Sequence, residues 1–404
     1  MNVSTTESTD EYPGNAMQSR NLWILGVLLA FPSTGFIQKH AGNVGVAAYV
    51  ALVVAAVILT VRLTRCFAPW LDRHFHKLAV LAISGLAASF VVLHPFEDRQ
   101  GPGNSSDRDE GLEMAVSRMA HGETPYYPSN RIAGPLSVLP GSIFLAAPFV
   151  ALGNPGYQNV FWLAVFLFVA RAFIGNAASA LWMLVVPLGL SIAAMYEFVS
   201  GGDLIANGIF VTLFFFFAIK SWNNSGTPPW QRWTACVMVG IGLASRANFV
   251  LLMPLFGAVM WRCAGLRSAM AATTVATMGY AATILPFYLN DPAGFTPLMS
   301  RDKVASLDAC LPWASTAIIG ATVLSALLGA VWLLVGARDE TQVAFFRVCT
   351  VVTLVPMIGT LLFSSCLYGH ADFSIMRDRF GLMYVFLALF GWGGAVRSLL
   401  RKSH

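Results

Sequence analysis

Residues 78–95 read LAVLAISGLAASFVVLHP, and residues 96–135 continue with FEDRQGPGNSSDRDEGLEMAVSRMAHGETPYYPSNRIAGP. The first run is apolar and close to the roughly 20 residues that cross a bilayer as a helix. The second is the longest polar stretch of the chain and holds seven of its 20 acidic residues: Glu97, Asp98, Asp107, Asp109, Glu110, Glu113 and Glu123. Carboxylates are costly near lipid, so this cluster beside a membrane helix indicates a functional site. The alternative is a solvated loop.

The composition predicts a membrane protein. Of the 404 residues, 56% are hydrophobic and 11% are charged, and the mean hydropathy is +0.65. Soluble domains carry about 25% charged residues. We therefore predict an all-α fold, a polytopic transmembrane helical bundle of about 11–13 helices, embedded in membrane lipids. The net charge of +5 is concentrated in a few short loops, which indicates membrane orientation and no nucleic-acid partner.

Apolar segments divide nearly the whole chain. We expect residues 1–20 to be a disordered tail and residues 21–404 to form a single transmembrane domain, in which 96–135 is an extracytoplasmic loop. Several segments are short, so their number exceeds the number of secure crossings. The candidate segments are 21–38, 43–62, 78–95, 136–152, 159–175, 178–198, 203–221, 233–245, 247–263, 269–289, 311–336, 343–366 and 380–400.

Basic residues predict the orientation. By the positive-inside rule, three clusters should be cytoplasmic: Arg62, Arg65, Arg73 and Lys77; Arg262 and Arg267; and Arg397, Arg401 and Lys402. The loop 96–135 then lies outside, as does the loop that contains 367–379. We expect a multi-pass protein of the plasma (inner) membrane with both termini in the cytoplasm.

One conflict of parity remains in this topology. Four segments separate the acidic loop from the turn at 221–232, which would place Lys220 and Arg232 outside. Either one of these segments is re-entrant, or 233–263 crosses only once around Arg246. The sequence does not decide between the two.

The acidic loop has an internal order. Four apolar residues recur at i, i+3, i+4 and i+7, which predicts an amphipathic helix lying along the membrane interface: Leu112, Ala115, Val116 and Met119. Gly122 can end this helix in a left-handed conformation, and Pro125 forbids its continuation. Tyr126 and Tyr127 suit the membrane–water boundary. A plain membrane-surface helix without catalytic function is the alternative.

Several short motifs follow one another in an order typical of one enzyme superfamily. They are Asp107-Arg108-Asp109, Gly122-Glu123-Thr124-Pro125-Tyr126, Gly134-Pro135-Leu136, Ser200-Gly201-Gly202-Asp203, and 240–246 (GIGLASR) before an apolar run that ends at Pro254. This order resembles the GT-C superfamily of integral-membrane glycosyltransferases over roughly residues 78–300. The chain departs from the pattern in having Arg246 where a Lys is expected, and two extra helices before the acidic loop, where a single helix suffices.

The resemblance implies a reaction. Such an enzyme moves a monosaccharide from a polyprenyl-phosphate donor, mannosyltransferase-like, to a lipid-linked or cell-envelope glycan acceptor outside the cytoplasm. A carboxylate would take the proton of the acceptor hydroxyl. Asp109 precedes Gly122 by 13 residues, close to the family interval, and is our candidate base, with Asp107 and Glu110 as rivals. Close acidic neighbours raise one pKa, whereas Arg108 opposes this.

The donor phosphate needs a cationic partner, and the sequence offers several. Arg246 is the first candidate if 233–245 and 247–263 are separate segments; otherwise we expect a structural pair with a carboxylate such as Glu197. The external turn before the last helix supplies Arg377, Arg379 and His370, with an Arg–Asp surface pair as the alternative. Tyr126, Tyr127 and Asp203 are candidate substrate contacts.

No cofactor is expected. A divalent cation bound by Asp107 and Asp109 is chemically reasonable, but no His or further acid stands at a fixed spacing from them. Two other classes of function stay open. One is a secondary transporter of a small solute, with Glu197 and Arg246 as a midplane pair; the other is a non-catalytic scaffold or flippase partner. The Asp109→Asn variant separates an enzyme from both.

Overall fold

The computed structural model describes residues 14–98, 106–127, 135–299, 305–309, 311–336 and 341–401, and within these ranges the protein contains helices and no strand. The α-helices are α1 (Gly14–Ala30), α2 (Thr34–Arg73), α3 (Phe75–Asp98), α4 (Arg108–Ala120), α5 (Pro140–Ala151), α6 (Tyr157–Ile174), α7 (Ala177–Leu190), α8 (Ile192–Val199), α9 (Leu204–Asn223), α10 (Pro229–Leu243), α11 (Met253–Ala264), α12 (Leu266–Asn290), α14 (Ala314–Val335), α15 (Thr341–Tyr368) and α16 (Leu382–Arg401). Short 3₁₀ turns are η1 (Phe31–Ser33), η2 (Ala247–Leu252), η3 (Thr296–Met299), η4 (Ser306–Ala309) and η5 (Ser374–Asp378). Helix α1 begins inside the segment predicted to be a tail, and residues 1–13 lie outside the described residues.

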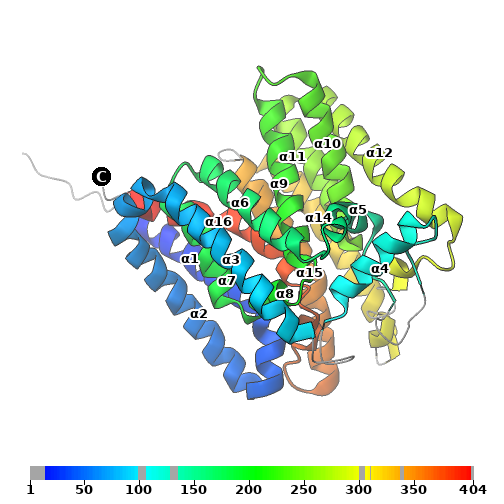
Figure 1. Cartoon of the computed structure of the whole chain (residues 1–404), viewed down its shortest axis with the longest axis horizontal. Helices are drawn as coiled ribbons and strands as arrows, with labels where there is room; N and C mark the ends of the chain where they lie inside the picture. The colour runs from blue at the N-terminus through cyan, green and yellow to red at the C-terminus, as the bar shows by residue number, and fades with distance from the viewer. Residues whose placement is uncertain are drawn as a thin grey trace, which may run out of the picture.

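The helices form one bundle that matches a multi-pass membrane protein (Figure 1). Among the described residues, eight helical runs are long and apolar enough to cross a membrane, or nine if the bent pair α7–α8 counts as one span. This number is lower than the 11–13 helices predicted. Helix α5 has only 12 residues and α10 only 15, so neither meets the length of a full span, and Arg20–Arg73 counts once although it folds back on itself.

The fold-back of the first run occurs near a glycine. Gly42 has φ +65° and ψ −170°, which interrupts the helix and is a conformation that L-residues avoid. The chain then returns along α1, close enough that a Cβ added to Gly26 would lie 2.9 Å from the Cα of Val54. The two predicted segments 21–38 and 43–62 therefore lie side by side (Figure 1).

A second turn is tied to the end of α2. Asn176 caps α7 by accepting the Ser179 N–H through Oδ1 at 2.7 Å. Asp72 accepts the backbone N–H groups of Ala177 and Ala178, both at 3.0 Å. Because these N–H groups have no partner within the helix, the carboxylate stabilises this helix start. The α2–α3 turn and the α6–α7 turn therefore share one end of the bundle.

Helix α5 does not cross the bundle, which removes the conflict of parity. At its start, the Leu139 N–H donates to the Ser245 carbonyl at 3.0 Å. Just after its end, the Asn154 amide lies 2.9 Å from Nε2 of His94, near the last turn of α3. Both ends of α5 therefore reach the end of the bundle that holds α4. The segment 136–152 is re-entrant, and 233–263 forms two helices, α10 and α11, that meet near Arg246.

A broken helix delivers further polar groups to the same end. Helices α7 and α8 meet at Ser191 with a bend of 90°. The Ser191 hydroxyl caps α8 by accepting the Ala194 N–H at 3.2 Å, so the break is hydrogen-bonded. Helix α8 carries Glu197, and the turn after it leads to Asp203 at the start of α9. Helix α9 is the most buried of the candidate spans, and Asp203, just before its first residue, is buried as well.

Candidate functional site

The predicted amphipathic helix of the acidic loop is present as α4. Leu112 and Ala115 are fully buried and pack in an apolar cluster with Tyr126 and residues of α5. The Tyr126 hydroxyl donates to the Val138 carbonyl at 3.3 Å. The helix ends at Ala120, and Gly122 follows with φ +76°, as expected for a left-handed stop. Residues 99–105 and 128–134 of the loop, including Gly134 of the third motif, lie outside the described residues.

Asp109 is buried at the start of α4. Its side chain lies against Gly201, where an added Cβ would be 3.3 Å from Oδ2. Its Oδ1 has no hydrogen-bond partner among the described residues. Burial raises the pKa of Asp109 to about 9, and the neighbouring carboxylates of Glu110 and Glu97 add to this effect by repulsion. The effect of an acidic neighbour on the pKa could be predicted from the sequence, but the burial of Asp109 could not.

His94 is the group that faces Asp109. Its Nε2 lies 3.6 Å from Asp109 Oδ2. The ring is held on three sides: Nδ1 lies 3.0 Å from the Val199 carbonyl oxygen, Nε2 lies 2.9 Å from Nδ2 of Asn154, and the ring stacks on Phe90 with centroids 4.8 Å apart. No sequence motif singled out His94. The available signal was that it is the single histidine in the apolar segment 78–95, placed at its last turn.

Asp203 and Arg246 form a fully buried ion pair. Arg246 Nη2 donates to both carboxylate oxygens of Asp203, at 2.6 Å to Oδ2. Ser142 and Asn207 donate to the same Oδ2 at 2.9 and 2.7 Å, and Arg108 Nη1 lies 3.7 Å from Oδ1. Burial raises the pKa of Asp203, but the guanidinium groups of Arg246 and Arg108 outweigh it, and the pKa lies below its ordinary value. Asp203, predicted as a substrate contact, is therefore the partner of Arg246 in place of Glu197.

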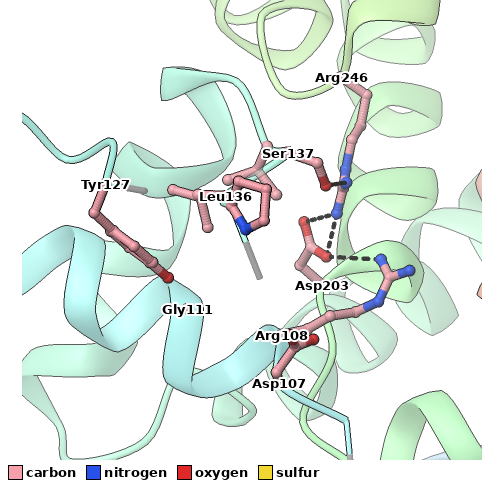
Figure 2. A pocket seen from close by; sticks show the side chains of 10 residues that line it. Asp107, Arg108, Gly111, Tyr127, Leu136, Ser137, Asp203 and Arg246 are labelled. Atoms are coloured by element: carbon pink, nitrogen blue, oxygen red, sulfur yellow. Dashed lines mark hydrogen bonds and ion pairs between the residues drawn. The ribbon is translucent and has the colours of Figure 1, made fainter. Parts of the chain in front are cut away.

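A small hollow of about 50 Å³, open in part to solvent, lies beside this pair (Figure 2). Arg108, Asp107 and Tyr127 line it from α4 and the following turn, and Ser137 and Arg246 line the opposite side. Arg246 Nη1 reaches the Ser137 hydroxyl only at 3.5 Å, and its Nε has no partner among the described residues. The Tyr127 hydroxyl is also without a partner there. The hollow therefore combines unused hydrogen-bond donors with two guanidinium groups.

Arg379 is bound within the protein. Its Nη1 lies 3.1 Å from Glu197 Oε2 and 3.2 Å from the Ser200 hydroxyl, and its Nη2 lies 3.0 Å from the Ser106 hydroxyl. The guanidinium also lies over the Tyr196 ring, 4.7 Å from its centroid. Arg379 has φ +60° and is the only non-glycine residue with a positive φ in the described ranges. It connects α8 to the residues just before α4.

The remaining predicted residues are more scattered. Asp107 is exposed at the rim of the hollow, and Glu110 is half-buried with a buried Oε2 that has no partner among the described residues. Arg377 is exposed in η5 and makes no ion pair with any described residue. His370 is exposed and contacts the Ala371 carbonyl oxygen at 3.2 Å. Neither Arg377 nor His370 lines the hollow.

No group of three His, Cys, Asp or Glu side chains suited to a metal ion occurs in the part of the chain that the structure describes. No protein-family model, curated protein or solved structure matches this chain. Two groups near the start of α4 therefore form the candidate site, although Asp109 itself is not among the residues that line the hollow. These are the buried carboxyl of Asp109 with His94, and the hollow lined by Arg108 and Arg246.

Proposed function

We propose that this protein is an integral-membrane glycosyltransferase that moves a monosaccharide from a polyprenyl-phosphate donor to a hydroxyl of a glycan or lipid-linked acceptor. The observation that carries the proposal is the carboxyl of Asp109, which is buried at one end of an apolar bundle with one oxygen unpartnered. Buried polar atoms without partners are rare in folded proteins, so the unpartnered carboxyl oxygen at the start of α4 is suited to a substrate hydroxyl.

Asp109 supports the role of general base. Its Oδ1 accepts no hydrogen bond from the described residues, so it is available to a hydroxyl. The neighbours Glu97 and Glu110 are acidic and raise the pKa, which makes the carboxylate a stronger proton acceptor once it has formed. Asp107 is exposed and Glu110 only half-buried, so they remain the weaker candidates.

The hollow supports binding of the donor phosphate. Guanidinium groups bind phosphate through paired N–H donors, and both Arg108 and Arg246 border the same space. Asp203 keeps Arg246 ionised and fixed while Nε and Nη1 retain donor capacity. Arg379, Arg377 and His370 do not line the hollow, so Arg246 and Arg108 are the stronger candidates for the phosphate.

The decisive experiment measures sugar transfer with a conservative pair of variants. Membranes containing the full chain are incubated with radiolabelled decaprenyl-phosphate mannose, glucose or arabinose, and label transferred out of the donor is counted. Asp109→Asn should lower the rate by about 10²–10⁴-fold, which is the usual contribution of a general base. Glu113→Gln makes the same chemical change at an exposed position of α4 and should leave the rate unchanged. An Asp109→Asn protein as active as wild type contradicts the proposal.

A second pair of variants tests the phosphate. Arg108→Gln should raise KM for the lipid donor about 10–100-fold, because a charged hydrogen bond contributes about 1.5–3 kcal/mol. Arg118→Gln, on the same helix, removes an arginine that pairs with the exposed Glu123 and should leave KM unchanged. Equal effects of the two substitutions contradict a phosphate contact at Arg108.

A secondary transporter is the second candidate function. The broken helix α7–α8 and the buried Asp203–Arg246 pair are features that transporters also use near their substrate sites. Transporters place such groups at the midplane, whereas these groups lie at the end of the bundle that holds α4. Uptake of labelled sugar phosphates into proteoliposomes, without any transfer of sugar from the lipid donor, is the result that favours this candidate.

A further inference from the structure

Arg379, just after η5, lies where segments that are far apart in the chain meet. Its Nη1 lies 3.1 Å from Glu197 Oε2 on α8 and 3.2 Å from the hydroxyl of Ser200, just after that helix. Its Nη2 lies 3.0 Å from the hydroxyl of Ser106, two residues before α4. The Ser106 N–H in turn donates to Glu97 Oε1 at 2.9 Å, near the end of α3. Arg379 therefore joins α8 to the residues from which α4 begins.

The turn η5 also holds the first residue of α4. Arg108 Nη2 donates to the Asp378 carbonyl at 2.7 Å, and its guanidinium lies 5.6 Å from the centroid of the Phe380 ring. Its Nη1 lies 3.7 Å from Asp203 Oδ1. The orientation of Arg108 beside the hollow is therefore set by η5 together with Asp203. Because Asp109 is the next residue of α4, a shift of this helix end displaces both candidate groups of the site.

The first helical hairpin, α1 with α2, fixes η5 through a separate set of contacts. The Phe373 N–H, just before η5, donates to Oε1 of Gln38 on α2 at 2.8 Å. Gly35 packs so closely that an added Cβ would lie 2.5 Å from the Phe373 carbonyl oxygen and 2.6 Å from the backbone nitrogen of Arg377. Backbone atoms cannot rotate away as the end of a long side chain can. A side chain at position 35 therefore has to displace the turn.

The backbone of Arg379 favours glycine, but the residue is an arginine whose side chain makes these contacts. Its φ of +60° is a left-handed conformation that glycine adopts most readily. We infer that Arg379 is a positioning residue, which together with η5 forms a brace that holds the start of α4 against α8 and the first helical hairpin. The inference rests on the proposed function, because Arg379 does not line the hollow and acts on sugar transfer only through Arg108 and Asp109.

The first test displaces the brace through a residue outside the candidate site. Gly35→Ala places a methyl group against the turn, and Gly85→Ala in α3 is the matched control, because a Cβ there meets nothing within 4 Å. In Gly35→Ala, kcat for transfer from the lipid donor should fall about 10-fold per folded molecule, and KM for the donor should rise because Arg108 moves. Gly85→Ala should keep both constants. Wild-type kinetics in Gly35→Ala overturn the inference.

The second test changes Arg379 itself and keeps its charge. Arg379→Lys leaves a cation beside Glu197 but gives up the paired donors, so kcat should fall about 10–100-fold and KM for the donor should rise. A protein that is merely less stable loses active molecules and keeps its KM. Arg377→Lys, at an exposed position of η5, should match the wild type. An unchanged KM in Arg379→Lys contradicts a positioning role.

The two variants together show whether they act through the same turn. The double variant, Gly35→Ala with Arg379→Lys, should lose no more rate than the stronger single variant, because η5 is already displaced. Two losses that multiply would mean that the residues act independently, and the brace would then be wrong.

Hydrogen exchange of the α4 amides tests the brace without any sugar transfer. In purified Arg379→Lys protein in detergent micelles, the amides near the start of α4 should exchange faster than in wild type, while those of α9 stay protected. Unchanged exchange in α4 rules out the brace whatever the kinetics show. If the wild type transfers no sugar from the lipid donor, but exchange in α4 rises in Arg379→Lys, the proposed function fails and the brace stands.

Discussion

Asp109 and Asp203 are both buried carboxyl groups at the same end of the bundle, but only Asp203 has a cation in direct contact. Asp203 accepts hydrogen bonds from Arg246, Ser142 and Asn207. Asp109 instead lies 3.6 Å from the imidazole of His94, and one of its oxygens has no hydrogen-bond partner among the described residues. The carboxylate of Asp203 therefore has hydrogen-bond partners for both oxygens, whereas Asp109 has one oxygen that remains available to a ligand.

The difference shows how neighbours decide the charge of a buried acid. Burial acts in the same direction on both groups and raises the pKa. At Asp203, the guanidinium groups of Arg246 and Arg108 reverse that effect, so the group is a fixed anion. At Asp109, the acidic neighbours add to burial and the group is neutral at pH 7. The Asp203–Arg246 pair stays ionised and fixes the side chains beside the hollow. Asp109, with a pKa raised toward neutral or higher pH, is the carboxyl suited to proton transfer.

Breaking the Asp203 pair should have the largest effect on stability. Asp203→Ala leaves the buried Arg246 without its carboxylate, and loss of one partner of a buried pair costs about 3–5 kcal/mol. The free energy of unfolding, measured by denaturant titration in detergent micelles, should fall by that amount. The exposed Glu113→Ala on α4 should change it by less than about 0.5 kcal/mol. A small loss in Asp203→Ala would mean that water replaces the carboxylate.

Replacing Asp109 should raise the free energy of unfolding, whereas replacing Asp203 should lower it. Its folded pKa, about 9, lies above the ordinary value of 3.8, so its contribution to stability is fully present below pH 3.8 and is lost as the pH rises to 9. Asn does not ionise, so Asp109→Asn should stabilise the fold by roughly 2–4 kcal/mol at pH 7.

The measurement for Asp109→Asn is the unfolding free energy of variant and wild type between pH 4 and pH 9. The difference should be small at pH 4 and should widen as the pH rises. Glu113→Gln should differ from wild type by a constant small amount. A difference independent of pH would show that Asp109 titrates normally in the folded protein.

Helix positions and the order of the acidic loop could be predicted from local sequence. The apolar length of 78–95 predicts α3, and the spacing of Leu112 and Ala115 predicts the buried face of α4. Gly122 ends that helix as expected, because few other residues adopt φ +76° without strain. These features depend on residues that are close in the chain.

Contacts between distant segments could not be predicted in this way. Asp203 and Arg246 are 43 residues apart and lie next to the ends of different helices, so no local spacing identifies them as partners. His94 reads as one polar residue in an apolar run, and its contact with Asp109 appears only in the folded structure. The sequence left open which segment, if any, turns back without crossing. Backbone hydrogen bonds to Ser245 and Ala244 at the start of α5 and the Asn154–His94 contact after its end identify 136–152, and apolar length does not encode these contacts.

Two glycines, Gly201 and Gly122, allow a test of whether displacing the Asp109 side chain lowers activity. Gly201 and Gly122 both have a left-handed backbone, with φ +70° and +76°, so either Gly→Ala change should cost about 1–2 kcal/mol in stability. A Cβ on Gly201 would press on Asp109 at 3.3 Å, while one on Gly122 meets nothing within 4 Å. Sugar transfer should therefore fall in Gly201→Ala and stay unchanged in Gly122→Ala. Equal loss of activity would mean that backbone strain alone is responsible.

The smallest expected effect concerns one hydrogen bond to Asp203. Ser142→Ala removes a hydroxyl that donates at 2.9 Å, and Arg246 and Asn207 continue to satisfy the carboxylate, so the loss should be about 1 kcal/mol. Ser179 is equally buried, but its hydroxyl has no hydrogen-bond partner among the described residues. Ser179→Ala should therefore be neutral or slightly stabilising in the same unfolding assay. If Ser142→Ala costs as much as Asp203→Ala, the hydroxyl is needed to keep the ion pair in place, and the network around Asp203 acts as one unit.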